Sequence, residues 1–503
     1  MSLKKEIAGS NVLFTTGNII ATIIAFVTSI ILARFLGPEG FGLYSMAIVV
    51  TSFFIVFTDL VVGSSITRFT SFFSSQKEYG KIKNLTFLLL KYRVVITFII
   101  AFLLAAFPTW IATNIFNKPG VEFVVLFSGI ILFLNSFTEF FVAFFNGVGN
   151  FKNIIGIRII ERISKFIFPV TFIFLGLGYI GAIYGLIASG IIGILVVVIM
   201  LRKYMYIFAS KKLKINKKEV YRFGFWSFVS SVTIIIFTMI DSFMITIMRS
   251  IPEIGFYRIA TTWTYAITTL IPISGFVMYS YFSRKQTKES VSTIFSSSIF
   301  YSSIIIFPLA FLLSRFSGPI INVFYGDGYS ASSNVLTILG FIAIPLVLGS
   351  IVSSYFSGIN RPDITTKIVT ISLVLNVILN YFFIINYGIV GAAIATLISL
   401  TFEIILMFAV IIHMKDAEVK YSHLYKPLIA SGVVYYIFGF IYVSGLIELI
   451  VYGILSMVVY FLIMIGIKGI KKTEIEEVRT FLYNIKFKFF RGKQSDRQEY
   501  TKL

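Results

Sequence analysis

The chain alternates between long apolar runs and short polar connections. Fourteen of these runs are long enough to cross a bilayer core of about 30 Å, which takes roughly 20 helical residues. Because backbone polar groups must be hydrogen-bonded inside lipid, the runs predict helices, not strands. The first run is too long for a signal peptide and lacks a small-residue cleavage site, so we predict that it is retained. The predicted spans are 11–33, 43–66, 86–108, 122–145, 154–177, 179–201, 222–247, 254–280, 291–314, 332–356, 365–386, 389–411, 425–444 and 447–467.

The composition supports a membrane protein: 57% of residues are hydrophobic, 13% are charged, and 56 are phenylalanine. The chain has no cysteine, which excludes disulfides and thiol chemistry. Its two histidines, His413 and His423, fall in one connection, where solvated side chains are expected. A glycine-rich phosphate loop, a Ser-His-Asp arrangement and metal-ligand spacing are all missing from the sequence. We therefore predict a protein that is not an enzyme and has no metal site or cofactor.

The net charge of +21 would suggest a nucleic-acid partner in a soluble protein, but its distribution indicates a membrane. Most of the 43 lysines and arginines fall at the N-terminus, in every second connection and in the tail. Positive residues stay on the cytoplasmic side, so we predict a multi-pass cell-membrane protein with both termini cytoplasmic and no nucleic-acid partner. The predicted outer connections hold few cations, namely Arg34, Lys118, Arg249, Arg258 and Arg315.

The chain contains an internal duplication. R-F-L-G-P-E-G-F-G-L-Y at 34–44 is echoed by R-S-I-P-E-I-G-F-Y at 249–257, and we call these the two copies of the repeated phrase. F-N-G-V-G-N at 145–150 and G-Y-I-G-A-I at 178–183 have similar echoes about 210 residues later. That offset contains six predicted crossings, an even number. The two halves should therefore have the same orientation, related by an axis along the membrane normal.

The duplication predicts the domain organisation. Residues 1–201 form a first bundle of six helices, and residues 222–412 form a second, parallel bundle. The basic segment 202–221 is the cytoplasmic linker between them, and 413–467 holds two further helices. In the basic tail, 468–503, Thr473 and Glu476 form a possible capping box before apolar residues at helical spacing. This favours an amphipathic helix on the inner leaflet, with a loosely ordered basic tail as the alternative.

Charged residues within predicted spans are candidates for function because they are costly in lipid. In the span 154–177, Arg158, Arg162 and Lys165 lie on one helix face, with Glu161 between them. Arginine forks and a lysine ammonium suit phosphate oxygens, so we predict that this stripe binds an anionic head group. In the alternative, Arg158 and Arg162 reach the lipid head groups while Lys165 pairs with Glu161.

The other intramembrane charges are scattered over several spans. Arg93 is a further head-group candidate, although both it and Lys91 could snorkel to the interface. Asp59 and Glu139 could counter the basic stripe or bind a coupling proton or sodium ion. Glu403, which is isolated in the sequence, is the candidate for an ion-linked carboxylate in the second half. Asp241 and Arg258 both fall toward the predicted outer side, where an ion pair could gate the site or merely join two helices.

The second half differs from the first at the position of the basic stripe. Lys165 maps onto Asn376, and Ser372, Asn376 and Asn380 share one face of the span 365–386. The first bundle should therefore bind anions, while the second should line a neutral cavity suited to hydroxyl-rich contacts. This asymmetry favours an anionic cargo over a cationic one.

Four short motifs resemble those of the polysaccharide-transport flippases, the O-antigen (Wzx-like) type of the multidrug/oligosaccharidyl-lipid/polysaccharide exporter superfamily. The resemblance covers most of residues 10–412 in matching order. The motifs are A-R-F-L-G-P-E-G-F-G-L-Y-S-M-A at 33–47, T-D-L-V-V-G-S-S-I-T-R-F at 58–69, I-D-S-F-M-I at 240–245 and V-F-Y-G-D-G-Y at 323–329.

The resemblance implies an all-α polytopic membrane protein of 14 transmembrane helices. Two parallel six-helix bundles would form a V like that of the multidrug exporters, with two additional C-terminal helices. It further implies a flippase that moves a polyprenyl- or dolichyl-(pyro)phosphate-linked oligosaccharide to the outer leaflet, with membrane lipids and polysaccharide assembly proteins as partners. An ion-coupled drug exporter or a flippase of the peptidoglycan lipid precursor remains the alternative. A glycosyltransferase or polymerase is disfavoured because the predicted outer connections are short.

Overall fold

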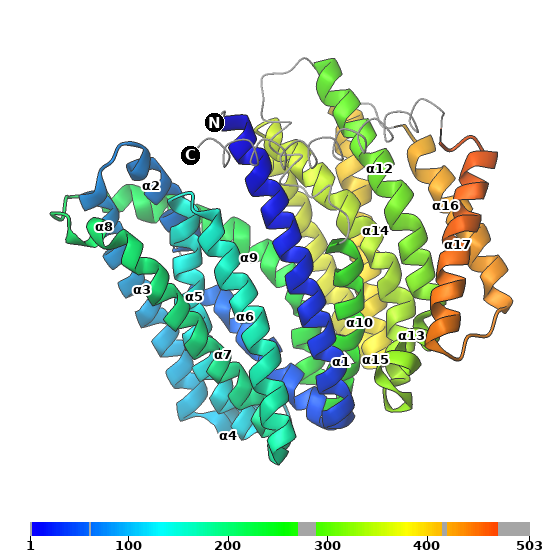
Figure 1. Cartoon of the computed structure of the whole chain (residues 1–503), viewed down its shortest axis with the longest axis horizontal. Coiled ribbons are helices and arrows are strands. Elements are labelled where there is room, and N and C mark those ends of the chain that lie inside the picture. Colours follow the sequence, from blue (N-terminus) through cyan, green and yellow to red (C-terminus); the bar gives the residue numbers. More distant parts are fainter. Residues whose placement is uncertain (1–2, 60–61, 270–287, 415–419, 471–503) are drawn as a thin grey trace, which may run out of the picture.

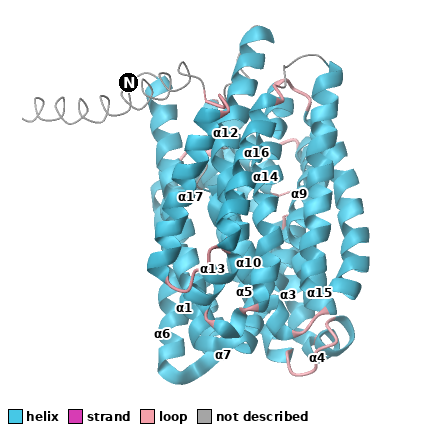
Figure 2. Cartoon of the chain, turned by 90° about the vertical axis from the view of Figure 1, so that its right-hand side faces the viewer, coloured by secondary structure: helices cyan, strands magenta, loops and turns pink. Residues whose placement is uncertain are grey.

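The computed structural model of this chain describes residues 3–59, 62–269, 288–414 and 420–470. Within these ranges every regular element is a helix, with a few short π and 3-10 turns (Figure 2). This confirms the predicted all-α class. The possible amphipathic helix of the tail, with Thr473 and Glu476, lies outside the described residues.

The described helices follow the order of the predicted spans. In the first half they are α1 (Leu3–Thr58), α2 (Gly63–Ser75), α3 (Tyr79–Ala106), α4 (Pro108–Trp110), α5 (Glu122–Gly147), α6 (Phe151–Phe172), α7 (Gly178–Leu201) and α8 (Met205–Ala209). In the second half they are α9 (Lys217–Met248), α10 (Ile251–Thr269), α12 (Lys288–Arg315), α13 (Ser317–Tyr325), α14 (Ala331–Gly358), α15 (Pro362–Met414), α16 (Ser422–Ile437) and α17 (Leu446–Gly466).

Two glycines replace loops at places where the sequence predicts connections. Gly37 interrupts α1 with φ 66°, and Gly388 interrupts α15 with φ 61°. Glycine adopts this left-handed backbone at little cost, so each long helix is divided into two segments by a single residue. The part of the chain that the structure describes contains 8 helical stretches long and apolar enough to cross a membrane. The full count of fourteen crossings stays a prediction.

The predicted span 43–66 is wrong at its end. The first long helix stops at Thr58, and α2 begins at Gly63 as a separate, short helix. The buried residues Ile66, Phe69 and Phe73 pack this helix against α3 and α5. The run looked continuous because the apolar face of a short packed helix resembles part of a membrane span.

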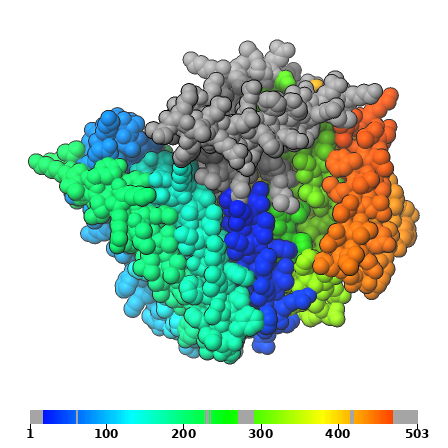
Figure 3. Space-filling view, viewed as in Figure 1, coloured from blue at the N-terminus to red at the C-terminus, as the bar shows by residue number. Residues whose placement is uncertain are grey.

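The helices form two groups beside each other (Figure 1). In that view α2 to α8 lie on the left and α12 to α17 on the right, while α1, α9 and α10 lie between them. Contacts between the halves run mainly through α1, which packs against both α9 and α10. The space-filling view places α16 and α17, in orange, at the edge farthest from the first half (Figure 3).

The buried apolar residues form three clusters that follow this arrangement. One cluster lies within the first half, around Phe140 and Phe144, and another lies within the second half, around Phe295 and Tyr355. The third contains Phe41 of α1 together with residues of α10, α13 and α14, so it belongs to both halves. The halves therefore share an apolar core at one end of the molecule. This is the end at which α1 turns at Gly37, and we refer to it as the predicted outer end.

Candidate functional site

A cavity of about 550 Å³ lies between the two halves. Its walls come from α1, α5, α6 and α7 of the first half and from α10 of the second. The lining carries three cations, Arg162, Lys165 and Arg258, and no aspartate or glutamate. Many of the remaining polar groups are uncharged and can bind hydroxyl groups, namely Thr22, Thr28, Ser29, Thr51, Ser52, Asn135, Thr261, Thr262, Tyr265 and Thr269.

The basic stripe predicted from the sequence lies on α6. Asn150 caps the start of this helix, since its side chain accepts a hydrogen bond from the backbone nitrogen of Asn153 at 3.1 Å. Farther along the chain, α7 packs tightly against α6. A Cβ added at Gly185 would lie 2.4 Å from the backbone nitrogen of Pro169, so only glycine allows this approach. These contacts fix the position of α6 and hence of its cations.

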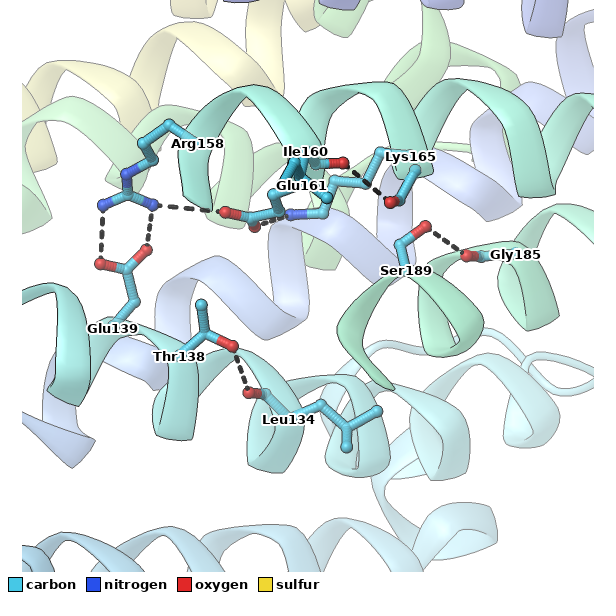
Figure 4. Close-up of polar contacts among 10 residues, drawn as sticks. Leu134, Thr138, Glu139, Arg158, Ile160, Glu161, Lys165, Gly185 and Ser189 are labelled. Carbon is cyan, nitrogen blue, oxygen red and sulfur yellow. Dashed lines mark hydrogen bonds and ion pairs between the residues drawn. The ribbon is translucent and has the colours of Figure 1, made fainter. Parts of the chain in front are cut away.

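Two carboxylates neutralise part of the stripe (Figure 4). Arg158 makes a bidentate pair with Glu139 of α5, with N–O distances of 2.5 and 2.8 Å. Glu161 lies 3.5 Å from Arg158 and accepts a hydrogen bond from Lys165 Nζ at 2.5 Å. Arg158 does not line the cavity, whereas Lys165 does. The predicted pairing of Lys165 with Glu161 is present, and Glu139 supplies a counter-charge that crosses between helices.

Arg162 and Arg258 are the cavity cations that remain without a carboxylate. Within the described ranges neither has an ion pair. Arg162 comes from α6 in the first half and Arg258 from α10 in the second. The cavity therefore receives one unpaired guanidinium from each half. Both line the cavity, where an anionic ligand would offset their charge.

Arg93 lies elsewhere. It is 4% exposed, forms an ion pair with Asp59, and donates from Nε to Ser136 Oγ at 2.9 Å. Thr97 and Ser136 share a further hydrogen bond of 2.9 Å. Arg93 does not line the cavity, so its position lends no support to a head-group role. Asp59, whose side chain is 35% exposed, provides the counter-charge, and snorkelling of Arg93 to the interface stays a prediction.

Asp241 and Arg258 do not form the pair that the sequence suggested. Tyr257, the residue before Arg258, donates its hydroxyl to Asp241 instead. Neighbouring residues on a helix point about 100° apart, so Tyr257 faces α9 while Arg258 faces the cavity. Asp241 also accepts from the Ser242 backbone at 2.7 Å and from Thr396 at 3.4 Å. All of these donors are neutral.

Two of the three residues predicted to line a neutral cavity, Asn376 and Asn380, instead join this buried cluster. Ser372, Asn376 and Asn380 are each at most 1% exposed, and none of them lines the cavity. Asn380 donates to Asn376 at 2.9 Å, and Asn376 donates to Thr396 at 3.4 Å. The carbonyl oxygen of the Asn380 side chain is buried without a hydrogen-bond partner in the described part of the chain. The prediction failed because the polar face points into the second bundle.

Glu403 is placed apart from both sites. Its Oε2 atom is buried and makes no hydrogen bond within the described ranges. A Cβ added at Gly349 of α14 would lie 4.0 Å from its Oε1 atom. The carboxylate therefore lies inside the second bundle, and its predicted role in ion coupling stays a prediction.

Sequence reasoning missed the hydroxyl-bearing walls of the cavity. Thr22 and Ser29 lie seven residues apart on one face of α1, and Thr262, Tyr265 and Thr269 share a face of α10. The signal was a polar face within an apolar span, which is detectable by periodicity. It was overlooked because threonine and serine carry no charge and are common in membrane helices.

A protein-family model described as "Polysaccharide biosynthesis protein" matches residues 8–286. An uncharacterized membrane protein of Methanocaldococcus jannaschii is 26% identical over 487 residues, which are 93% of this chain and 96% of that protein. A putative O-antigen transporter of Shigella flexneri is 26% identical, covering 78% of this chain and 94% of its own. A probable low-salt glycan biosynthesis flippase of Haloferax volcanii is 26% identical over 52% of this chain and 57% of its own.

Two solved structures, a flippase and a transporter by title, have a similar fold. The lipid II flippase MurJ, in an inward closed conformation, has a TM-score of 0.73 at 18% identity, covering 90% of this chain and 98% of its own. An inward-facing multidrug resistance transporter of the MATE family has a TM-score of 0.64 at 17% identity, covering 79% and 94%. At this identity the likeness shows a shared fold.

Proposed function

The chain belongs to the polysaccharide biosynthesis protein family, and we propose that it is a flippase for a lipid-linked oligosaccharide. In this proposal it moves a polyprenyl- or dolichyl-(pyro)phosphate-linked glycan from the inner to the outer leaflet by alternating access. The product would enter surface polysaccharide or glycan synthesis, together with assembly proteins of that pathway. The names of the Shigella flexneri and Haloferax volcanii relatives support this substrate class.

The observation that carries the proposal is the charge of the cavity. Arg162 and Arg258 provide two unpaired guanidinium groups, Lys165 provides a third cation, and the lining has no carboxylate. Guanidinium groups form paired hydrogen bonds with phosphate oxygens. The surrounding threonine, serine and asparagine side chains could bind sugar hydroxyls. A cationic drug, by contrast, would be repelled, which disfavours the drug-exporter alternative.

The test replaces the two unpaired arginines. We expect Arg162→Ala and Arg258→Ala each to weaken head-group binding and flipping about tenfold or more, since a hydrogen bond to a charged group contributes roughly 1.5–3 kcal/mol. Flipping is measured in vesicles containing purified protein and a polyprenyl-diphosphate oligosaccharide, as the fraction of glycan that becomes accessible to an added glycosidase. Lys152→Ala serves as the control, because Lys152 is an exposed cation on the same helix.

The two outcomes separate the competing functions. A lower flipping rate in both arginine variants with a normal rate in Lys152→Ala supports the flippase. Unchanged flipping together with altered efflux of a cationic dye would instead support a drug exporter of the same fold.

The coupling ion, if flipping is ion-driven, belongs at Asp241 in this proposal. Asp59 and Glu139 each pair with an arginine, while the partners of Asp241 are all neutral. A buried carboxylate in lipid without a counter-charge favours binding a proton or a cation. Side-chain oxygens of Thr396, Asn376 and Asn380 lie in the same cluster. Oxygen ligands of this kind suit Na⁺ as well as a proton.

Imposed gradients test this assignment. We expect a Na⁺ or pH gradient to accelerate flipping by the unchanged protein, because the bound ion neutralises Asp241 in only some conformations. The Asp241→Asn variant should lose that response, while Asp363→Asn, in the exposed first turn of α15, should keep it. If Glu403→Gln abolishes the response and Asp241→Asn does not, the coupling site lies at Glu403 instead.

The orientation in the membrane forms part of the same proposal. The distribution of lysine and arginine supports a plasma or inner membrane location with both termini in the cytoplasm. The division into bundles at 1–201 and 222–412, joined by the linker 202–221, is proposed on the duplication. Cargo would then enter the cavity from the cytoplasmic end and leave past the turn at Gly37.

A further inference from the structure

The two copies of the repeated phrase lie against each other. Gly42 of the first copy and Gly255 of the second occupy equivalent positions, and a Cβ added at Gly255 would lie 3.2 Å from the backbone nitrogen of Gly42. A Cβ added at Gly42 would lie 2.2 Å from the carbonyl oxygen of Ile251. Each of these glycines lies two residues before the tyrosine that ends its copy. The phrase therefore brings α1 and α10 into backbone contact.

Two cations of the first half bind carbonyl groups of the second half beside this contact. Arg34 donates to the carbonyl oxygens of Val323 and Phe324 at 2.6 and 2.7 Å, near the end of α13. Lys118 donates to the carbonyl oxygen of Thr246 at 2.5 Å, near the end of α9. The last carbonyls of a helix lack partners within the helix and carry partial negative charge. Each cation thus caps a helix that belongs to the opposite half.

A third hydrogen bond crosses at the same end. The hydroxyl of Tyr329, which is 2% exposed, donates to the carbonyl oxygen of Ala33 at 2.6 Å. Phe41 and Tyr44 of the first copy line the cavity itself. The contact between the halves therefore lies directly between the cavity and the predicted outer end.

We propose that the two copies of the repeated phrase are the outer gate of the transporter and that Arg34 and Lys118 are its latch. The proposal rests on the proposed function, because a flippase must open its outer end to release cargo. The latch bonds are made to carbonyl groups, and water can replace the cation there when the halves separate. Gly42 and Gly255 permit the backbones of α1 and α10 to meet closely in the closed gate.

Cross-linking tests whether the contact must open. The chain has no cysteine, so an introduced pair of cysteines can be cross-linked without interference from other thiols of the protein. Pro38→Cys with Gly328→Cys joins the two halves, since a Cβ at Gly328 would lie 3.5 Å from Pro38 Cγ. Gly193→Cys with Thr138→Cys is the matched control within the first half, with a Cβ–Cβ distance of 4.0 Å, within the range for a disulfide of about 3.5–4.5 Å.

We expect oxidation of the pair across the halves to lower flipping at least about tenfold and reduction to restore it, while the control pair flips normally in both states. The reduced protein serves as the folding control. Normal flipping by the oxidised pair across the halves would overturn the gate.

Thiol labelling tests the latch without measuring flipping. A Thr261→Cys variant places one thiol on the cavity wall, and a membrane-impermeant maleimide is added from the outside of intact cells. Replacing both Arg34 and Lys118 by alanine should increase the labelling rate about tenfold. Arg315→Ala is the control, because Arg315 also binds helix-end carbonyls, those of Phe438 and Gly439, but within the second half. Its labelling should stay at the original rate.

An unchanged rate in the double variant would overturn the latch. This measurement also separates the two proposals. Increased labelling in a protein that flips no lipid-linked glycan would support the gate and contradict the proposed cargo.

Discussion

Arg93 illustrates what a single charge requires inside the membrane. Its side chain is 5% exposed. Its Nη1 atom forms the ion pair with Asp59, and its Nε atom donates a hydrogen bond to Ser136 Oγ. Without that pair, the carboxylate of Asp59 would remain in a half-buried position with no counter-charge. A buried pair adds little net stability over apolar residues, but breaking it is costly.

We therefore expect Arg93→Met to destabilise the folded protein by about 3 kcal/mol, the lower end for a broken buried pair, because Asp59 retains some contact with solvent. Replacing Asp59 by asparagine as well should recover most of the loss. Thermal unfolding in detergent measures both variants. Arg361→Met, which breaks an exposed pair with Asp363, provides the comparison and should change little. Equal melting temperatures for all three would contradict this account.

The contrast between Arg158 and Arg162 shows how position on a helix sets the role of a residue. Both are on α6, four residues apart, yet Arg158 is held by Glu139 while Arg162 faces the cavity. Because Glu139 comes from another helix, no local pattern of the sequence reveals which arginine is neutralised. The sequence identified the stripe, and the tertiary contacts decide which members can bind cargo.

At the level of helices, the sequence predicted what apolar periodicity encodes. It located the helices that correspond to α3, α5, α6 and α14 to within several residues, because a long apolar run in lipid has few alternatives. It missed α2, and it treated the outer connections as plain loops although short helices α4 and α13 lie there. Short helices depend on packing partners distant in sequence, so a local pattern does not specify them.

The same limit explains the errors at the site. The alternation of Tyr257 and Arg258 on α10 decides that Asp241 pairs with a hydroxyl instead of a guanidinium. Likewise the polar face with Asn376 and Asn380 was recognised, but the direction in which it points depends on how α15 is rotated against α9. Periodicity fixes which residues share a face and leaves open what that face meets.

At the scale of the whole molecule, the two halves touch most firmly at the predicted outer end, and Lys118 is one of the groups that hold them. It lies in the connection before α5, outside the membrane-spanning helices. Burial lowers the pKa of Lys118 to about 8. The pKa is close to 10.4 when the side chain is in water. Between about pH 8 and pH 10.4, Lys118 has therefore lost its proton in the folded state but keeps it in the unfolded state.

This difference makes the stability depend on pH. Where the unfolded state binds more protons, the free energy of unfolding increases with pH, so the cost of burying the charged Lys118 side chain should diminish from about pH 8 to pH 10.4. Below that window the whole cost is present and does not change with pH. We expect the melting temperature of the unchanged protein, relative to that of Lys118→Met, to rise across this range and to be constant from pH 6 to 7. A relative melting temperature that falls as pH rises would contradict the assignment.

The close approach of Gly42 and Gly255 has a consequence for how the duplicated gene can diverge. Each copy of the phrase is the packing partner of the other, so a larger residue in one copy must be accommodated by the other before it can be inherited without loss. Selection then acts on the pair, and the two copies drift together. Cavity-lining residues outside the phrase, such as Arg162 and Lys165 on α6, are not part of this contact, which leaves each half free to acquire its own chemistry for cargo.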